Sequence, residues 1–505
     1  MSDTANTAFE QLCQFSRQTA TLQSIEELLG WDERTMLPPS GGEFRAEQIT
    51  CLSGLVHRRR TDPQVGRWLE ELVDSPLAAD PHSDTGATIR QIKRGYEKHI
   101  KLPQSLVEEL ARTAVLGQQA WTEARKNDNF ASFQPLLERT YELKRRQAEA
   151  IGYATNPYDA LLDDYEPDAK TADVQEVLTG LREQLAPFVA AIADSGRQAN
   201  VEILRRNYPI DVQEAFGKQV AAAIGFDFQR GRLDVTHHPF CAGLGPDDCR
   251  ITTRYDERNF PSAFFGILHE AGHGLYEQGL RKDQFGLPPG CYVSLGIHES
   301  QSRMWENAVG RSHAFWQYVF PQARKSFPGA LPDVTLDEFY FAINDVRPSL
   351  IRVEADEATY NLHIVIRFEL EQALLAGDLA VADLPGAWND KYRDYLGIEP
   401  PHDADGVLQD IHWSAGLVGY FPTYSLGNLY AAQFFAQADL DLGDLDGQLA
   451  RGEFAPLREW LCQKIHRQGE CYTPSELVQR ITGRPLSHEP LMDYLRGKLE
   501  PLYGI

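Results

Sequence analysis

The stretch N-F-P-S-A-F-F-G-I-L-H-E-A-G-H-G-L, residues 259–275, guides the interpretation of the whole sequence. Pro261 stands where helices commonly begin, and apolar residues then recur at helical spacing. His269 and His273 are four positions apart, so a helix places both imidazoles on one face, where they can bind one metal ion. Glu270 would lie beside that ion, where a general base can take a proton from water. The stretch therefore predicts a largely apolar helix that carries a metal site.

A catalytic metal of this kind needs a third protein ligand and one open position. The best candidate is Glu299, which lies beyond His273 by enough chain for a loop and the start of a second helix. His298 competes for this role, and it could instead be a histidine of the core or of a groove rim. Metal-binding histidines usually have a hydrogen-bond partner behind them, which in thermolysin-like enzymes is often an acid four positions after the ligand glutamate. Arg303 stands there instead, so the sequence does not identify the partner.

Composition excludes several classes of protein. The chain has 505 residues, and 42% of them are hydrophobic, which is enough for a large core. With 49 Lys and Arg against 73 Asp and Glu, the net charge of −24 argues against binding to nucleic acid or to an anionic membrane. There is no apolar run of membrane-spanning length, no visible secretion signal, and no C-x-x-C pair among the scattered cysteines. We therefore expect a cytoplasmic protein with no nucleic-acid or membrane partner.

Most of the sequence has the periodicity of helices, and strand-like material is scarce. Helical patterning is clear in the segments 6–29, 42–59, 106–121, 133–151, 171–194, 211–224 and 365–376. The best strand candidates are 233–236 and 249–255, where β-branched and aromatic residues gather. No repeat or linker divides the chain. We expect a mainly α fold in a single domain, residues 1–505, with two lobes around a groove.

Several further motifs follow one another along the chain. They are His238-Pro239-Phe240, Asp248-x-Arg250-x-Thr252, His269 to His273, His298-Glu299-Ser300-Gln301, Ile351-Arg352-x-x-Ala355-Asp356 and Gly406-x-x-Gln409-Asp410-x-His412-Trp413. Together with the blocks 31–38 and 158–167, they resemble the thermostable carboxypeptidase Taq family of metallocarboxypeptidases over essentially the whole chain. One departure is Asp168-Ala169-Lys170, where relatives usually carry Gly and Met. It lies outside the catalytic blocks.

The resemblance implies a large helical metallopeptidase fold akin to neurolysin and angiotensin-converting enzyme. A deep central groove and a small β-sheet beside the active site belong to that fold. The resemblance also implies one divalent metal ion per chain, with zinc as the first choice and cobalt able to substitute, on His269, His273 and Glu299. The implied activity is the release of single C-terminal amino acids from peptides with a free C-terminus, with broad specificity and Glu270 as general base. A cytoplasmic homodimer is implied as well.

Peptide hydrolysis builds an oxyanion that needs hydrogen-bond donors opposite the metal. The segment 419–424 offers two phenols, and related helical peptidases place a His and a Tyr in this part of the chain. We therefore expect Tyr420 to be the oxyanion donor and His412 its companion, with Tyr424 in reserve. Each of them could instead be a core aromatic or a buried histidine with a purely structural role.

Two residues near the candidate strands are candidates for the substrate groove. Related peptidases hold the substrate backbone on an edge strand in this part of the chain, so His238 would line the groove. Arg250 alternates with Asp248 on a candidate strand, and side chains two apart share one face. The favoured interpretation for this pair is an ion pair that braces the groove, and the alternative is contact with substrate.

An exopeptidase must also recognise the free end of its substrate, and an arginine binds a carboxylate through two parallel hydrogen bonds. Arg352 is the first choice because the resemblance places its motif beside the groove, and Arg250 is the second. The alternative for Arg352 is a surface pair with Asp356, four residues on, in a helix that begins after Pro348.

Two other functions remain open from the sequence. A catalytically silent helical peptide-binding protein would retain the groove, but such proteins commonly lose the general base, which is intact here as Glu270. A dipeptide-releasing or endo-acting oligopeptidase on the same scaffold is harder to separate. The number of residues that it releases depends on how the groove is closed.

Overall fold

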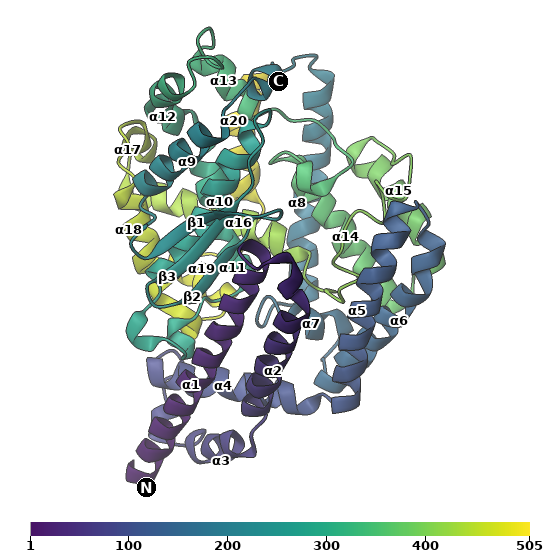
Figure 1. Cartoon of the computed structure of the whole chain (residues 1–505), viewed down its shortest axis with the longest axis vertical. Helices are drawn as coiled ribbons and strands as arrows, with labels where there is room; N and C mark the ends of the chain where they lie inside the picture. The colour runs from purple at the N-terminus through teal and green to yellow at the C-terminus, as the bar shows by residue number, and fades with distance from the viewer. Residues whose placement is uncertain (1) are drawn as a thin grey trace.

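The computed structural model describes residues 2–505, and helices make up most of it (Figure 1). The helices before the sheet are α1 (Ser2–Thr35), α2 (Gly42–Arg60), α3 (Pro63–Leu72), α4 (Asp84–Lys101), α5 (Gln104–Lys126), α6 (Phe130–Ile151), α7 (Pro157–Leu162), α8 (Thr171–Asp194) and α9 (Ile210–Ile224). Those after it are α10 (Phe260–Gly279), α11 (Leu295–Arg303), α12 (His313–Ser326), α13 (Leu336–Ile343), α14 (Thr359–Ala376), α15 (Leu384–Leu396), α16 (Pro422–Leu442), α17 (Leu445–Ala450), α18 (Ala455–Lys464), α19 (Pro474–Thr482) and α20 (Glu489–Tyr503). The prediction of a mainly α fold is confirmed.

Helical periodicity located the helices well. Every segment with clear periodicity lies within an observed helix, and the predicted segment 171–194 coincides with α8. Leu178, Leu181 and Leu185 recur every three or four residues along α8 and are buried, so one stripe of the helix faces the core. The burial of such stripes explains why the sequence pattern was informative.

A small sheet of three strands contains β1 (Gly231–Val235), β2 (Cys241–Gly245) and β3 (Asp248–Thr253). The order is β1-β3-β2, with β1 parallel and β2 antiparallel to the central β3. The two predicted strands correspond to β1 and β3. The strand β2 was not predicted because its sequence, C-A-G-L-G, has no β-branched or aromatic residue. Because β2 is at the edge of the sheet, one side of the strand has no partner strand, and its residues line the cavity described below.

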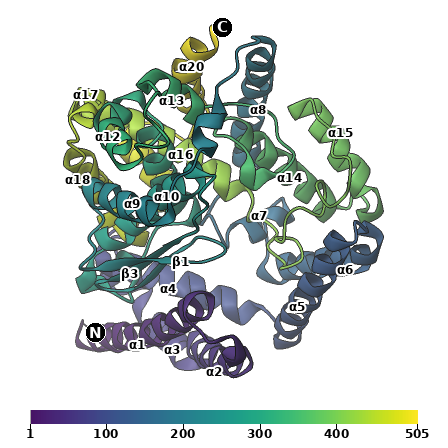
Figure 2. The ribbon, with the colours of Figure 1, turned by 45° about the horizontal axis from the view of Figure 1, so that its top comes forward.

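The sheet lies between α10 and the long helix α1 (Figure 2). A large core cluster includes buried residues of α10, α11, α14 and α16. Helices α1, α3 and α4 bury a separate cluster, which consists of Ala5, Ala8, Leu12, Val65, Leu69, Leu72 and Ile89. A third, small cluster joins Trp31 of α1 to Ala242 and Leu244 of β2. The N-terminal helices therefore have a core of their own, and α1 also contacts the sheet through this small cluster and through the arginines that stack on Trp31.

Two features of the described residues bear on compartment and membranes. No helix in residues 2–505 is long and apolar enough to cross a bilayer. Cysteines Cys13, Cys51, Cys241, Cys249, Cys291, Cys462 and Cys471 are all free thiols.

Candidate active site

Helix α10 carries the two histidines and is buried on most of its surface. Asn259 caps it by accepting a hydrogen bond from the backbone N–H of Ser262, at 3.3 Å. Gly272 lets α11 approach closely, since a Cβ there would lie 2.5 Å from the carbonyl oxygen of Gln301. The predicted helix is confirmed, and the glycine between the histidines explains how a second helix can reach the same site.

Helix α11 supplies Glu299 and is fixed at its N-terminus. Ser294 caps it by accepting from the backbone N–H of Ile297, at 3.0 Å. The buried carboxylate of Glu166 accepts from the backbone N–H of Gly296, at 3.1 Å, and from the hydroxyl of Tyr430, at 2.8 Å. A carboxylate at this end of a helix also complements the helix dipole.

The three predicted metal ligands converge. The Nε2 atoms of His269 and His273 lie 3.7 and 3.4 Å from Oε2 of Glu299. One candidate ligand atom from each residue lies within 4.8 Å of the others, and no other such group of three occurs among residues 2–505. Two nitrogen donors and one carboxylate oxygen form a ligand set that suits a divalent ion with an open position.

The partner of His269 is Glu306, which the sequence analysis missed. Its Oε2 lies 2.8 Å from Nδ1 of His269. Glu306 follows Glu299 by two helical turns, in the π-helix Met304–Val309 that continues α11. Arg303 lies between the two acids, donating to Oε1 of Glu299 at 2.7 Å and to Oε2 of Glu306 at 3.1 Å. The acid that supports His269 therefore lies one helical turn beyond the position that the thermolysin-like pattern indicates. Arg303 occupies that position and pairs with the carboxylates of Glu299 and Glu306.

His298 lies behind His273 rather than among the three converging ligands. The Nδ1 atoms of His273 and His298 are 2.5 Å apart. On its other side, Nε2 of His298 lies 2.8 Å from Oε1 of Glu277. The structure thus favours Glu299 over His298 as the third ligand.

The charges around the ligands favour a cation. Burial by itself would lower the pKa of His269, but the carboxylates of Glu299 and Glu306 outweigh it and raise that pKa to about 9. Burial dominates at His273 and lowers its pKa to about 3, so this imidazole is neutral and its nitrogen is available to a metal. The two ionised carboxylates therefore favour a positive charge at His269, and a divalent ion could take the place of the proton that this imidazole holds.

Glu270 is 5% exposed and lies on α10 directly beside the ligand His269. Burial raises the pKa of its carboxyl to about 7, although the neighbouring His269 acts in the opposite direction. A carboxyl with a pKa in this range can exchange protons near neutral pH, as a general base must.

A cavity of about 590 Å³ opens onto these residues. The three metal ligands, Glu270, Tyr420 and Tyr424 contribute to its walls, together with β2 and the 20–27 segment of α1. These six predicted site residues therefore share one cavity with the edge strand. This volume is large enough for a small ligand or the end of a peptide.

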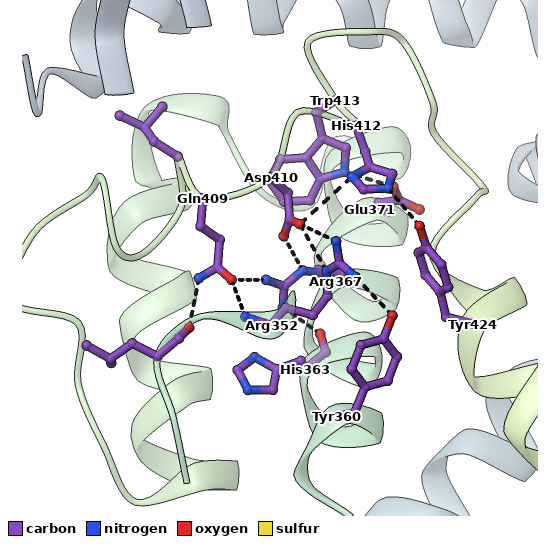
Figure 3. A network of polar contacts seen from close by, with 12 residues as sticks. Arg352, Tyr360, His363, Arg367, Glu371, Gln409, Asp410, His412, Trp413 and Tyr424 are labelled. Carbon is purple, nitrogen blue, oxygen red and sulfur yellow. Dashed lines mark hydrogen bonds and ion pairs between the residues drawn. The ribbon is translucent and has the colours of Figure 1, made fainter. Parts of the chain in front are cut away.

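Tyr420 and Tyr424 line the cavity, whereas His412 does not. Figure 3 shows His412 in contact with Tyr424. Nε2 of His412 is 3.2 Å from the hydroxyl of Tyr424, and the rings of the two tyrosines are 5.4 Å apart. Burial lowers the pKa of His412 to about 4, so its imidazole is neutral near pH 7. The structure brings together all three predicted oxyanion candidates, with Tyr424 between His412 and the cavity.

Arg352 occupies a different environment from the helix surface considered above (Figure 3). It begins the 3-10 turn Arg352–Glu354 and is 5% exposed. Its Nε and Nη2 donate to Oδ1 of Asp410 at 2.9 and 2.8 Å, and its Nη1 donates to the hydroxyl of Tyr360 at 2.9 Å. The alternative of a surface pair with Asp356 is wrong, because Arg352 pairs with Asp410 and Asp356 caps the start of α14 through Thr359.

A second arginine, Arg367, shares the same carboxylate and was not found from the sequence. Its Nε donates to Oδ2 of Asp410 at 2.6 Å, and it is fully buried on α14. The amide oxygen of Gln409 accepts from Nη2 of Arg367 at 2.8 Å and from the backbone N–H of Arg352 at 2.9 Å. Despite burial, the two guanidiniums hold the pKa of Asp410 far below its usual range. With His412 neutral, this cluster of two arginines and one aspartate has one surplus positive charge.

The two candidates near the sheet have different surroundings. His238 is exposed and lies outside the cavity, which its neighbours Pro239 and Phe240 line. Arg250 donates from Nε and Nη2 to the two oxygens of Asp248, both at 2.9 Å, and its guanidinium lies 4.3 Å from the ring centre of Trp31. Asp248 and Arg250 therefore form the ion pair that was the favoured interpretation, and the pair also connects the sheet to α1 through Trp31.

The buried Glu166 at the start of α11 makes stability depend on pH. Burial raises its pKa to about 7, although hydrogen bonds from Tyr430, Ser294 and Gly296 oppose the shift. The pKa of Glu166 is higher in the folded protein than in the unfolded chain. The contribution of Glu166 to the free energy of unfolding is therefore complete below about pH 4.5 and is lost as the pH rises through about 7.

Replacement of Glu166 by Gln removes this titration and retains a side chain that can accept from Gly296. Between about pH 5 and about pH 8, we expect the free energy of unfolding of the variant to gain about 2–3 kcal/mol relative to wild type. Denaturant unfolding at both pH values measures this change. Parallel pH profiles for the two proteins would contradict the prediction.

Comparisons with known proteins agree with this geometry. The sequence matches the family described as carboxypeptidase Taq (M32) metallopeptidase over residues 11–499. It is 48% identical to thermostable carboxypeptidase 1 of Thermus thermophilus, across 99% of this chain and 100% of the relative. It is 39% identical to carboxypeptidase 1 of Bacillus subtilis, across 94% and 95% of the two chains. The crystal structure of the M32 carboxypeptidase from Deinococcus radiodurans superposes with a TM-score of 0.94 at 41% identity, across 99% and 100% of the chains.

Two histidines and a glutamate that could hold a metal ion, with a buried glutamate beside them, have the composition that a metallopeptidase site requires. The chain belongs to the carboxypeptidase Taq (M32) family of metallopeptidases. The resemblance recognised from the sequence motifs is thereby confirmed.

Proposed function

We propose that this protein is a metal-dependent carboxypeptidase that releases single C-terminal amino acids, with broad specificity, from peptides with a free C-terminus. The observation that carries the proposal is the convergence of His269, His273 and Glu299 beside Glu270 in one cavity. The family of the chain is a metallopeptidase family, and its relatives from Thermus thermophilus and Bacillus subtilis are named carboxypeptidases.

The proposed cofactor is one divalent ion per chain, zinc in the first place, with cobalt as a possible substitute. Nitrogen and carboxylate donors in this number suit zinc, and the ionised carboxylates of Glu299 and Glu306 favour a cation beside them. When bound, the ion would supply a Lewis acid that polarises the scissile carbonyl and makes water more acidic.

The chain's own residues would perform the proton transfers. Glu270 would accept the proton of the attacking water and pass it to the leaving amine, which matches its raised pKa. Burial also raises the pKa of Tyr420, which keeps the phenol protonated as a hydrogen-bond donor to the oxyanion. Tyr424, whose hydroxyl is 3.2 Å from Nε2 of His412, would be the second donor, with His412 orienting it from behind.

The cluster of Arg352, Arg367 and Asp410 is the proposed recognition site for the substrate carboxylate. It carries a surplus positive charge and adjoins the cavity through Tyr424, whose ring centre is 5.1 Å from the guanidinium carbon of Arg352. Arg352 uses three of its N–H groups on Asp410 and Tyr360, which leaves two to bind a terminal carboxylate. Arg250 is a weaker candidate, because Asp248 and Trp31 already engage its guanidinium.

Several properties of the whole molecule are proposed on weaker grounds. A scaffold akin to neurolysin and angiotensin-converting enzyme, with two lobes in one domain, is supported by helices arranged around a cavity. A cytoplasmic location is supported by the free cysteines, which are typical of reducing compartments. A homodimer rests on the family resemblance alone. The net charge of −24 supports the absence of a nucleic-acid or membrane partner.

Removal of the metal tests the proposed mechanism. Treatment with a chelator, followed by verification that the protein is metal-free, is expected to abolish peptide hydrolysis because Glu270 alone cannot polarise the scissile carbonyl. Addition of zinc or cobalt should restore hydrolysis at one ion per chain. A matched sample carried through the same treatment without chelator controls for inactivation. Full activity in the metal-free protein would overturn the mechanism.

A further inference from the structure

We propose that Glu277 and His298 are positioning residues that hold His273 in the orientation and tautomer that binds the metal. This inference rests on the proposed metal site and adds a function for two residues that the proposed reaction does not otherwise use. The sequence also offers His298 as a rival metal ligand, but in the structure His298 contacts the ligand His273 and is not one of the three converging residues.

The three side chains form a continuous chain of polar contacts. Nε2 of His273 faces Glu299 at 3.4 Å, so its Nδ1 faces away from the metal position. That Nδ1 is 2.5 Å from Nδ1 of His298, whose Nε2 is 2.8 Å from Oε1 of Glu277. The order from the metal position outward is therefore His273, His298 and Glu277.

This order of contacts suits the tautomer of His273 that metal binding requires. At the outer end, Oε1 of Glu277 is placed to accept an N–H from Nε2 of His298, at 2.8 Å. Metal binding through Nε2 of His273 requires the proton of that ring to be on Nδ1, and Nδ1 of His298 lies 2.5 Å away, where it can accept this N–H. The remaining nitrogen of His273, Nε2, is left with a free lone pair directed at the metal position. For His269 a single contact, from Nδ1 to Glu306, leaves Nε2 directed at the metal position in the same way.

Packing holds the chain of contacts in place. The ring of His298 lies 5.1 Å from that of Tyr276 and 4.9 Å from that of Tyr292, and only 13% of its side chain is exposed. Glu277 follows His273 by one helical turn on α10, so both side chains project from the same face. Two aromatic rings and one helix face therefore limit the orientations open to His298.

Glu277, at the outer end of this series of contacts, lies against the edge strand β2. A Cβ at Gly243 would lie 2.2 Å from Oε2 of Glu277, so only glycine lets the carboxylate lie this close to the strand. Gly243 and Glu277 both line the cavity. The strand that borders the substrate cavity is thus in contact with the residue that orients His273, and Gly243→Ala should disturb the metal site from a distance.

Metal affinity is the direct readout of this role. We expect His298→Phe, which keeps a ring but removes the acceptor, to retain one zinc ion per chain with an affinity about 10- to 100-fold lower. Glu277→Gln, which is nearly isosteric, should give a smaller loss in the same direction, as should Gly243→Ala. His298→Asn offers an oxygen near the Nδ1 position and should recover part of the affinity. Competition with a chromophoric chelator on the purified full-length protein measures each value, and the visible spectrum of the cobalt-loaded protein reports ligand geometry.

Two matched controls separate positioning from general destabilisation. His466 is a buried histidine that packs 4.9 Å from the same Tyr276 but bonds to Gln301, so His466→Phe should leave zinc affinity unchanged. Glu27 lines the same cavity from α1, so Glu27→Gln controls for the loss of a carboxylate. Thermal unfolding of each metal-free variant shows how much of any change is due to folding.

The outcomes distinguish this inference from the proposed function. If wild type binds no zinc or cobalt, the proposed metal site fails and this inference fails with it. If wild type binds one ion and both His298→Phe and Glu277→Gln bind it equally tightly, the positioning role is overturned while the metal site stands. If His298→Phe loses the ion as completely as Glu299→Ala does, His298 is a ligand and the inference is overturned. Weakened binding at unchanged stoichiometry, with both controls unaffected, supports it.

Discussion

Replacing Glu270 by Gln is expected to lower the turnover number by about a hundredfold to ten-thousandfold while metal content stays at the wild-type level. The amide has nearly the same shape as the carboxyl, so the buried helix α10 should be undisturbed. It cannot accept a proton from water, and the ligand atoms of His269, His273 and Glu299 are unchanged. Steady-state kinetics combined with metal analysis of the same sample measures both properties.

Glu27→Gln is the matched control for that experiment, because this carboxylate lines the same cavity from α1 and has no proposed role in the reaction. It should leave turnover within a few-fold of wild type. If Glu270→Gln loses its metal together with its activity, Glu270 has a structural role at the metal site. If it keeps both, another residue is the general base.

The second large effect concerns the free C-terminus of the substrate. Wild type should strongly prefer a peptide with a free terminal carboxylate over the same peptide with a C-terminal amide. Arg352→Lys should reduce this preference by about 10- to 100-fold, since a lost hydrogen bond between charged groups costs about 1.5–3 kcal/mol. Lysine keeps the positive charge opposite Asp410 but loses the planar fork of the guanidinium.

The measurement is the ratio of kcat/KM for the two peptides. This ratio is independent of the fraction of enzyme that is correctly folded, which matters because Arg352 is buried and its replacement affects stability. Arg250→Lys is the matched control and should leave the ratio unchanged, as Arg250 pairs with Asp248. If Arg250→Lys reduces the ratio and Arg352→Lys does not, the two arginines exchange roles.

Local sequence patterns predicted the parts of the site that lie on single helices. The two histidines are one helical turn apart, and a buried apolar helix was the natural frame for them. Glu299 was found because it lies at the next helix start, and α11 does begin at Leu295. Periodicity alone was sufficient for the two histidines, whereas Glu299 lies on a second helix and competed with His298 until the fold placed it beside them.

The residues that support the ligands were harder to predict because their partners come from other turns or other elements. Glu306 was overlooked at two turns beyond Glu299, although residues seven apart share a helix face. The contact between His273 and His298 joins two helices that only the fold brings together. A family resemblance identifies the metal ligands more readily than the residues that hydrogen-bond to those ligands.

For Arg352, the local sequence pattern indicated the wrong partner and the wrong environment. The spacing to Asp356 is that of an exposed helical pair, and no local pattern reveals that the side chain is buried. Its true partner, Asp410, is in another motif, and Arg367 has no motif to mark it within the buried helix α14. The edge strand β2 was missed for a related reason, since its strand form depends on pairing with β3 rather than on its own residues.

The sharpest test of the central claim is the identity of the products. Metal-loaded enzyme should be incubated with a peptide that has both ends free, and the product masses followed over time. The proposed function predicts a ladder in which the peptide shortens by one C-terminal residue at each step, together with free amino acids. Release of dipeptides, or internal fragments that appear before any single-residue loss, would contradict it and support an oligopeptidase on the same scaffold.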